Sequence, residues 1–301
     1  MLINEIYEKV RMDGVRGLLN AVFHRFFPQR LAYYPNCKTS LQGRFGLEIG
    51  GPSHIFGSQG LIPAYTIAAC IDNCTFSHQT IWEGEISEGN TFHFNKKKSP
   101  GKQYIVEASN LERIESARYD FVISSHVLEH VANPLRALSE WVRILKEDGT
   151  FILVLPHKDG TFDHRRPVTS LEHLIQDFEQ QTGEGDTTHM KEIFELHDLS
   201  RDPDAGDMDS FKKRSIKNME NRCLHQHVFD TGLAIEVVNH MGLQILSVEL
   251  FKPFHIVIVA QKLKSEVHAM NDEFIGRGTL PRWTSPFPSD QPSRHQIQAT
   301  A

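Results

Sequence analysis

The chain has 301 residues, 40% of them apolar and 23% charged, a balance that is typical of globular proteins and excludes a wholly disordered or fibrous chain. Its 32 Lys and Arg residues against 38 Asp and Glu residues give a net charge of −6, so no excess of positive charge is present to attract nucleic acid. No apolar run approaches the roughly 20 residues of a transmembrane helix, no secretory signal is visible, and four cysteines are too few for a disulfide scaffold, so we expect a cytoplasmic protein.

The first forty residues are expected to form an N-terminal helical extension, residues 1–40. Apolar residues recur at about helical spacing from Ile6 to Phe26. Aromatic and basic residues alternate near the end of this segment. We expect a helix that packs on the domain or covers its ligand site, and peripheral contact with a membrane surface is the alternative.

Residues 41–156 alternate between short apolar runs and a helical pattern. Strands are predicted at 44–50, 65–72, 104–107, 119–125 and 150–155. Asn133 and Pro134 suit the N-cap and first turn of a helix that precedes the fifth strand. Near-continuous apolar strands are covered on both faces. The pattern predicts an α/β fold with a doubly wound, Rossmann-like, mostly parallel sheet.

Residues 157–230 break this alternation because they are rich in His and Asp and poor in long apolar strands. We predict an insertion after the fifth strand, with short helices at 171–178 and 190–196 and a loop at 200–210. A helix and two strands within 231–262 then complete the core. The polar, Pro- and Ser-rich segment 263–301 is predicted to be a flexible tail.

The turn Glu48-Ile-Gly-Gly-Pro-Ser53 follows the first predicted strand. In a doubly wound sheet the ligand binds beyond the carboxyl ends of the strands, and glycines let the backbone approach it closely. Asp72 ends the second predicted strand and could accept hydrogen bonds from ribose hydroxyls, and Glu107 could meet an adenine amine. A dinucleotide site would need G-x-G-x-x-G, but Pro52 replaces the second glycine, which favours a ligand with ribose and no phosphate.

Three segments together carry a family resemblance: the turn at 48–53, the run Tyr119-Asp-Phe-Val-Ile-Ser-Ser-His-Val-Leu-Glu-His-Val131, and Leu145-Lys-Glu-Asp-Gly149. They resemble the class I S-adenosylmethionine-dependent methyltransferases of the methyltransferase-11/23 type. The resemblance covers about residues 44–156 and, more loosely, 231–261.

The resemblance implies S-adenosylmethionine as cofactor. It implies cofactor-binding roles for Glu48, Gly50 and Gly51 beside the methionine part, Asp72 at the ribose, Glu107 and Ala108 at the adenine, and Ser125 and His126 beneath the sulfonium. The dipeptide Gly51-Pro52 departs from the family's pattern, in which a later glycine follows. Glu129 and His130 have a simpler alternative role, which is to cap and orient the helix that follows them.

Methyl transfer to a hydroxyl needs an aligned acceptor and a base that removes its proton. Residues just after the fifth strand face the cofactor side of the sheet, and there His157, Asp163 and His164 are the predicted catalytic residues. His173 and Asp177 lie four residues apart, on one helical face. The surrounding density of His and Asp also supports a divalent metal that orients the hydroxyl, although no spacing matches a closed zinc motif.

The sequence therefore predicts an S-adenosylmethionine-dependent methyltransferase that acts on a small molecule or sugar, by O-methylation with a His or Asp general base. A catalytically inactive S-adenosylmethionine-binding module is the alternative. An NAD-dependent oxidoreductase or epimerase is disfavoured because the pyrophosphate glycines and a Tyr-x-x-x-Lys motif are absent. Nothing in the sequence specifies the oligomeric state.

Overall fold

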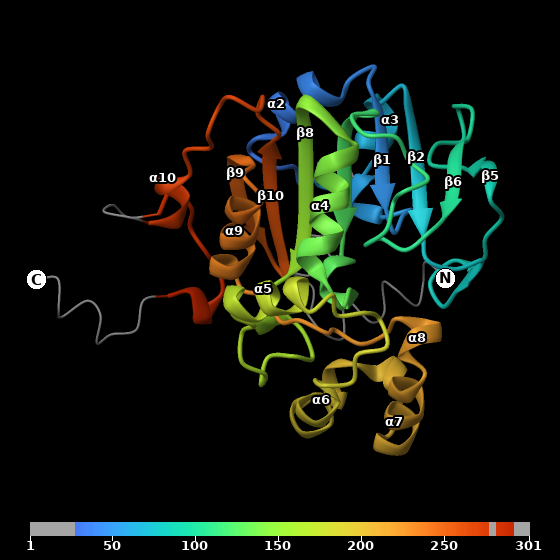
Figure 1. Ribbon diagram of the computed structural model, residues 1–301, viewed down its shortest axis with the longest axis vertical. Helices are drawn as coiled ribbons and strands as arrows, with labels where there is room; N and C mark the ends of the chain where they lie inside the picture. Colours follow the sequence, from blue (N-terminus) through green and yellow to red (C-terminus); the bar gives the residue numbers. More distant parts are fainter. Residues whose placement is uncertain (1–27, 277–280, 292–301) are drawn as a thin grey trace, which may run out of the picture.

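The computed structural model describes residues 28–276 and 281–291, so the helix predicted between Ile6 and Phe26 lies outside the described residues. At the centre is an eight-stranded sheet (Figure 1). Its spatial order is β5 (Gly89–Phe92), β6 (Gly101–Ile105), β2 (Cys70–Thr75), β1 (Phe45–Ile49), β7 (Tyr119–Ser125), β8 (Leu145–Pro156), β10 (His255–Gln261) and β9 (Gln244–Phe251). A separate hairpin pairs β3 (Gln79–Thr80) with β4 (Gly84–Glu85).

The five strands β6, β2, β1, β7 and β8 are parallel, whereas β5, β10 and β9 each pair antiparallel to a neighbour. The order of the parallel strands reverses between β1 and β7. In doubly wound sheets the ligand binds at such a reversal, beyond the carboxyl ends of the strands. The predicted fold class, an α/β sheet that is mostly parallel, is confirmed.

Helices cover both faces of the sheet, because each central strand buries side chains on both sides. One face packs against α4 (Pro134–Ile144), α5 (Leu171–Glu179), α9 (Thr231–His240) and α10 (Asp272–Ile275). The other packs against α2 (Tyr34–Leu41), α3 (Ala64–Ile67) and the 3-10 turn η1 (His54–Phe56). On β7, Val122 points into the first layer and Phe121 and Ile123 into the second. No helix among the described residues has the length and apolar character needed to cross a membrane.

The insertion forms a lobe below the carboxyl ends of the parallel strands (Figure 1). It holds α6 (Met190–Leu196), α7 (Met208–Ile216) and α8 (Asn218–Asn221), with a small core of Ile193, Ala205, Phe211 and Leu224. Short 3-10 turns connect the elements: η2 (Leu128–His130), η3 (Lys158–Gly160), η4 (Leu199–Arg201), η5 (Pro203–Ala205) and η6 (Pro288–Asp290). The predicted loop at 200–210 is therefore partly ordered, and α7 begins within it because Asp207 accepts a hydrogen bond from the Ser210 N–H.

The second strand was misplaced by the sequence pattern. It runs from Cys70 to Thr75, and Ala64–Ile67 is helical instead of extended. Tyr65 directs its ring between Phe56 and Phe94 from this helix, which explains why the segment is apolar without being a strand.

The described part of the predicted flexible tail packs against the core. Phe274 of α10 and Phe287 are 2% and 3% exposed. The Phe287 ring stacks on His157 at a centroid distance of 4.0 Å. Ser289 donates its N–H to Asp159 over 2.8 Å. The polar composition concealed these two aromatic anchors, so the expectation of a flexible tail did not include the packing of Phe274 and Phe287 on the core.

Phe287→Ala should therefore destabilise the protein by about 3 kcal/mol, the usual cost of truncating a buried phenylalanine. Phe178→Ala is the matched control, because the Phe178 side chain lies on α5 and is 45% exposed. Urea unfolding of both variants measures the free energies, and equal, small losses would contradict the packing of the C-terminal segment.

Candidate functional site

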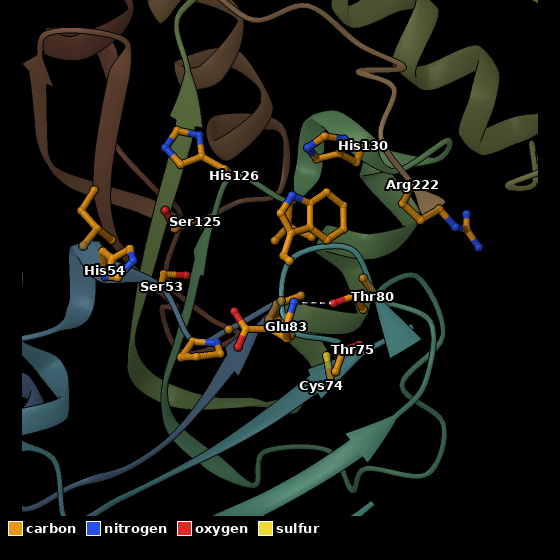
Figure 2. Close-up of a pocket in the computed structure, with 18 of the residues that line it drawn as sticks. Ser53, His54, Cys74, Thr75, Thr80, Glu83, Ser125, His126, His130 and Arg222 are labelled. Carbon is orange, nitrogen blue, oxygen red and sulfur yellow. Dashed lines mark hydrogen bonds between the residues drawn. The ribbon is translucent and has the colours of Figure 1, made fainter. Parts of the chain in front are cut away.

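A cavity of about 1120 Å³ opens at the carboxyl ends of β1, β2, β6 and β7. Its wall is formed by the turn after β1 (50–55), the end of β2 (74–76), the residues after β6 (106–108) and those after β7 (125–127), with Glu184 and Arg222 from the insertion. Figure 2 shows His130 and Arg222 on the side opposite Ser53 and His54. Binding cavities usually measure about 300–1,000 Å³, so this one has room for two small molecules together.

The turn after β1 requires both of its glycines. Gly50 has a φ of +77°, and a Cβ there would lie 2.4 Å from the Val127 Cγ2. A Cβ on Gly51 would lie 2.2 Å from the carboxyl carbon of Glu48. Asn73 fixes the turn by accepting from the Gly51 N–H over 2.9 Å and donating to the Gly51 carbonyl over 3.0 Å. The backbone at Gly50 and Gly51 therefore faces the cavity without side chains, so that a ligand can approach it closely.

Glu48 supports this turn from below and does not line the cavity. Its side chain is fully buried and accepts hydrogen bonds from the Tyr65 hydroxyl over 2.6 Å and from the Ser53 N–H over 3.0 Å. Burial raises the pKa of Glu48 to about 7, although these hydrogen bonds oppose the rise. The expected place of Glu48 beside the cofactor is therefore corrected to an anchoring one.

Asp72 is also displaced from its predicted role. It lies within β2, opposite Leu47, and its carboxylate accepts from the Tyr119 hydroxyl over 2.9 Å and from the Lys102 N–H over 2.8 Å. The strand continues to Thr75, and the cavity wall takes up Cys74, Thr75 and Phe76 in place of Asp72. The prediction failed because it ended the second strand three residues too early.

Glu107 and Ala108 do line the cavity, as predicted. The Arg222 guanidinium donates to Glu107 over 2.6 Å and also to Glu184. Glu184 in turn accepts from the Ala132 N–H over 3.3 Å. Burial raises the pKa of Glu107, and the positive charge of Arg222 opposes this. Arg222 therefore links the cofactor side of the wall to the insertion.

Ser125 and His126, also predicted, lie in the wall at the end of β7. His126 has a φ of +55° and directs its ring at His255, so that its Nε2 lies 2.9 Å from the His255 Nδ1. The His126 Nδ1 is 3.6 Å from the Glu129 carboxylate. Burial, and then the neighbouring His126, lower the pKa of His255 to about 4. The two imidazoles form a pair in which His255 is neutral at pH 7.

Glu129 lies at the centre of a cluster of histidines. From the sequence, an alternative role of Glu129 and His130 was to cap and orient the helix that follows them. It is 1% exposed, and its Oε1 lies 3.8 Å from the His130 Nε2. His130 donates from Nδ1 to the Leu224 carbonyl over 3.0 Å, and its ring lies 4.7 Å from the His225 ring. Burial opposes ionisation of Glu129, but His126, His130 and His225 lower its pKa overall. The N-cap of α4 is Asn133, as predicted, whose side chain accepts a hydrogen bond from the Arg136 N–H.

The three predicted catalytic residues lie outside the cavity wall. The His157 Nε2 lies 3.2 Å from Asp290, and the His164 Nε2 lies 2.8 Å from Asp198. The His157 N–H donates to the Phe254 carbonyl, next to the last residue pair of β8 and β10. Asp163 alone retains an indirect connection, through its hydrogen bond with His225. The structure thus places none of the three in the wall, whereas His130, Arg222 and His255, which the prediction did not include, do line it.

Residues 71–153 match the model of a family described as "Methyltransferase domain". No curated protein sequence matches the chain. Among solved structures, the chain is similar to a putative S-adenosylmethionine dependent methyltransferase from Listeria monocytogenes, with 18% identity over 77% of this chain and 98% of that one and a TM-score of 0.42. A S-adenosylmethionine dependent methyltransferase from Mesorhizobium loti is 13% identical over 76% and 97%, with a TM-score of 0.42. A SAM-dependent methyltransferase, possible histamine N-methyltransferase, from Thermotoga maritima is 16% identical over 86% and 99%, with a TM-score of 0.39.

Glu48→Gln should remove a pH-dependent loss of stability. The folded-state pKa of Glu48, about 7, exceeds its ordinary value of 4.5. The stability linked to its protonation is therefore fully present below pH 4.5 and is lost as the pH rises through about 7. The loss amounts to about 3 kcal/mol for the carboxyl and to nothing for an amide.

Urea unfolding at pH 5 and pH 8 tests this prediction. The free energy of unfolding of Glu48→Gln should rise relative to the native protein between these two pH values. Glu147→Gln is the control, since Glu147 is exposed. Parallel pH profiles of the native protein and Glu48→Gln would contradict the prediction.

Proposed function

We propose that the chain is a class I S-adenosylmethionine-dependent methyltransferase that methylates a hydroxyl group of a small molecule or sugar, and the match of residues 71–153 to a methyltransferase domain supports this. The observation that carries the proposal is the position of the imidazole pair of His126 and His255 beside a buried carboxylate, in the wall of a cavity large enough for cofactor and acceptor.

The turn after β1 fits a cofactor that has ribose but no phosphate. Beyond Gly51 the chain enters η1, a turn of three residues, and not a long helix whose N-terminus could hold a pyrophosphate. S-adenosylmethionine, when bound, supplies an electrophilic methyl group on a sulfonium. The bare backbone at Gly50 and Gly51 would hold its methionine part, and Glu107 and Ala108 would lie at its adenine. Thr75 offers a hydroxyl at the end of β2, where an acid was expected for the ribose.

The acceptor side supports a hydroxyl substrate. An alcohol must lose its proton as the oxygen attacks carbon, and a neutral imidazole accepts that proton near pH 7. Within the pair, His126 would take this proton, because the lowered pKa of His255 makes that ring the weaker base. The Glu129 carboxylate, 3.6 Å from the His126 Nδ1, would then stabilise the positive charge on the imidazole. A His and carboxylate base is thus retained, with different residues from those predicted.

The insertion supports a small polar acceptor. Arg222 and Glu184 close the cavity on that side with charged groups that can donate to and accept from hydroxyls. The net charge of −6 disfavours nucleic acid. A donor-binding protein without turnover remains the alternative outcome, and it would leave the imidazole pair without a catalytic role.

Gly50→Ala should weaken the binding of S-adenosylmethionine and S-adenosylhomocysteine at least tenfold, about 1.4 kcal/mol, because the added Cβ meets Val127 at the turn. Gly43→Ala is a matched control: Gly43 also has a positive φ, of +68°, but a Cβ there meets nothing within 4 Å. Calorimetric titration measures both. Failure of the folded native protein to bind either ligand would overturn the cofactor assignment.

Glu129→Gln should lower kcat about 10²-fold or more, the range for loss of general-base assistance, while the affinity for S-adenosylhomocysteine is unchanged. Glu147→Gln, an exposed residue outside the cavity wall, should have little effect on kcat. Transfer of radiolabelled methyl to a panel of alcohols, methyl glycosides and amines of similar size provides the assay. Methylation of the amines alone, or full activity of Glu129→Gln, would contradict the proposed chemistry.

A further inference from the structure

Four side chains of the insertion converge at a point outside the cavity wall. His173 and Asp177 lie one turn apart on α5, His189 immediately precedes α6, and His227 lies in the segment that leads to α9. The folded chain therefore gathers groups that are up to 54 residues apart in sequence, which spacing alone could not indicate.

The distances between these groups suit a shared ion. The His173 Nε2 lies 3.1 Å from the His189 Nε2 and 3.3 Å from the Asp177 Oδ2. One ligand atom from each histidine lies within 4.8 Å of those of the other two. Tetrahedral ligands bound to zinc at about 2.0–2.1 Å are separated from one another by about 3.4 Å.

Two buried polar atoms of this cluster have no hydrogen-bond partner among the described residues. Asp177 is 8% exposed, and among the described residues its Oδ2 has no hydrogen-bond partner. The buried Nδ1 of His227 also has none within the described part of the chain. A buried carboxylate oxygen without a partner is costly. A cation bound between the carboxylate and the imidazoles would remove that cost.

The groups behind the cluster are those that orient metal ligands. Asp177 accepts from the Thr182 hydroxyl over 3.0 Å, which leaves its Oδ2 free to bind. The His227 Nε2 lies 3.3 Å from the Ala132 carbonyl, which suits donation from Nε2 and an open lone pair on Nδ1.

We propose that His173, Asp177, His189 and His227 bind one zinc-type divalent cation. Three imidazoles and one carboxylate suit zinc in tetrahedral coordination, and four protein ligands are typical of a structural site. The second cluster of acidic and imidazole groups, Glu129 with His130 and His225, borders the cavity and belongs to the site already described.

The ion would organise the acceptor side of the cavity, an inference that rests on the proposed function. Asp177 and His189 bracket the loop 178–188, which carries Glu184 into the cavity wall. His227 lies two residues from His225, whose ring packs on that of His130. Loss of the ion should therefore raise KM for the acceptor and leave the affinity for S-adenosylhomocysteine unchanged.

Metal content tests the site without an activity assay. The full chain, expressed with added zinc and freed of any purification tag, should contain about one zinc per molecule by mass spectrometry. Asp177→Asn and His173→Ala should lower this at least about tenfold. His240→Ala should keep the metal because His240 is exposed on α9, and Glu129→Gln should keep it because Glu129 belongs to the other cluster. Far-UV circular dichroism shows that each variant is folded.

Cobalt provides a second readout. Cobalt-loaded native protein should show the strong visible absorption of a tetrahedral site, and His189→Ala should lose it. Native protein that holds no zinc after dialysis, or metal lost from Glu129→Gln and retained by Asp177→Asn, would overturn the proposal. A protein that binds zinc at these residues but methylates no alcohol would leave the metal site standing and refute the proposed function alone.

Discussion

The carboxylate of Glu129 has to be buried where β7 meets the insertion, and the site is built around that constraint. An isolated buried charge costs several kcal/mol, which only charged or hydrogen-bonding neighbours can offset. His126 and His130 approach this carboxylate from the end of β7 and from η2. His225 approaches from the insertion, and the Glu129 carbonyl accepts the N–H of His227. The insertion therefore adds a third imidazole, that of His225, to the two that β7 and η2 bring to Glu129.

The tripeptide His225-Gln-His227 contacts both groups of residues, because the chain bends at Gln226 and His227 instead of continuing as an extended strand. His225 faces His130 and Asp163, and His227 faces the cluster on α5. Arg166, 1% exposed, holds the tripeptide in place by donating to the carbonyls of His225 over 2.8 Å and Gln226 over 3.1 Å. One short segment thus serves both the cavity and the proposed metal site.

Strands β1, β7, β8 and β10 could be predicted from local patterns because each contains a buried apolar run, as Tyr119–Ser125 does. The glycine turn, Glu107 and His126 could be placed because they follow those strands directly. Asp72 could not, since the boundary between α3 and β2 depends on the packing of Tyr65, which is a tertiary contact. The sequence also did not indicate the interaction partners of His157 and His164. His157 and His164 were closest to the fifth strand in sequence, but their partners Asp290 and Asp198 lie 133 and 34 residues further along the chain.

The pKa values of two buried carboxyls, on the two sides of the cavity, shift in opposite directions. Glu48 is surrounded by a tyrosine hydroxyl and a backbone N–H, so burial dominates and its pKa rises to about 7. Glu129 is as deeply buried, but its imidazole neighbours outweigh burial and lower its pKa. Glu129 therefore stays negatively charged next to the imidazole that would gain a proton in the proposed reaction. The turn on the cofactor side depends on hydrogen bonds that a neutral carboxyl can also accept, so its geometry does not require an ionised group.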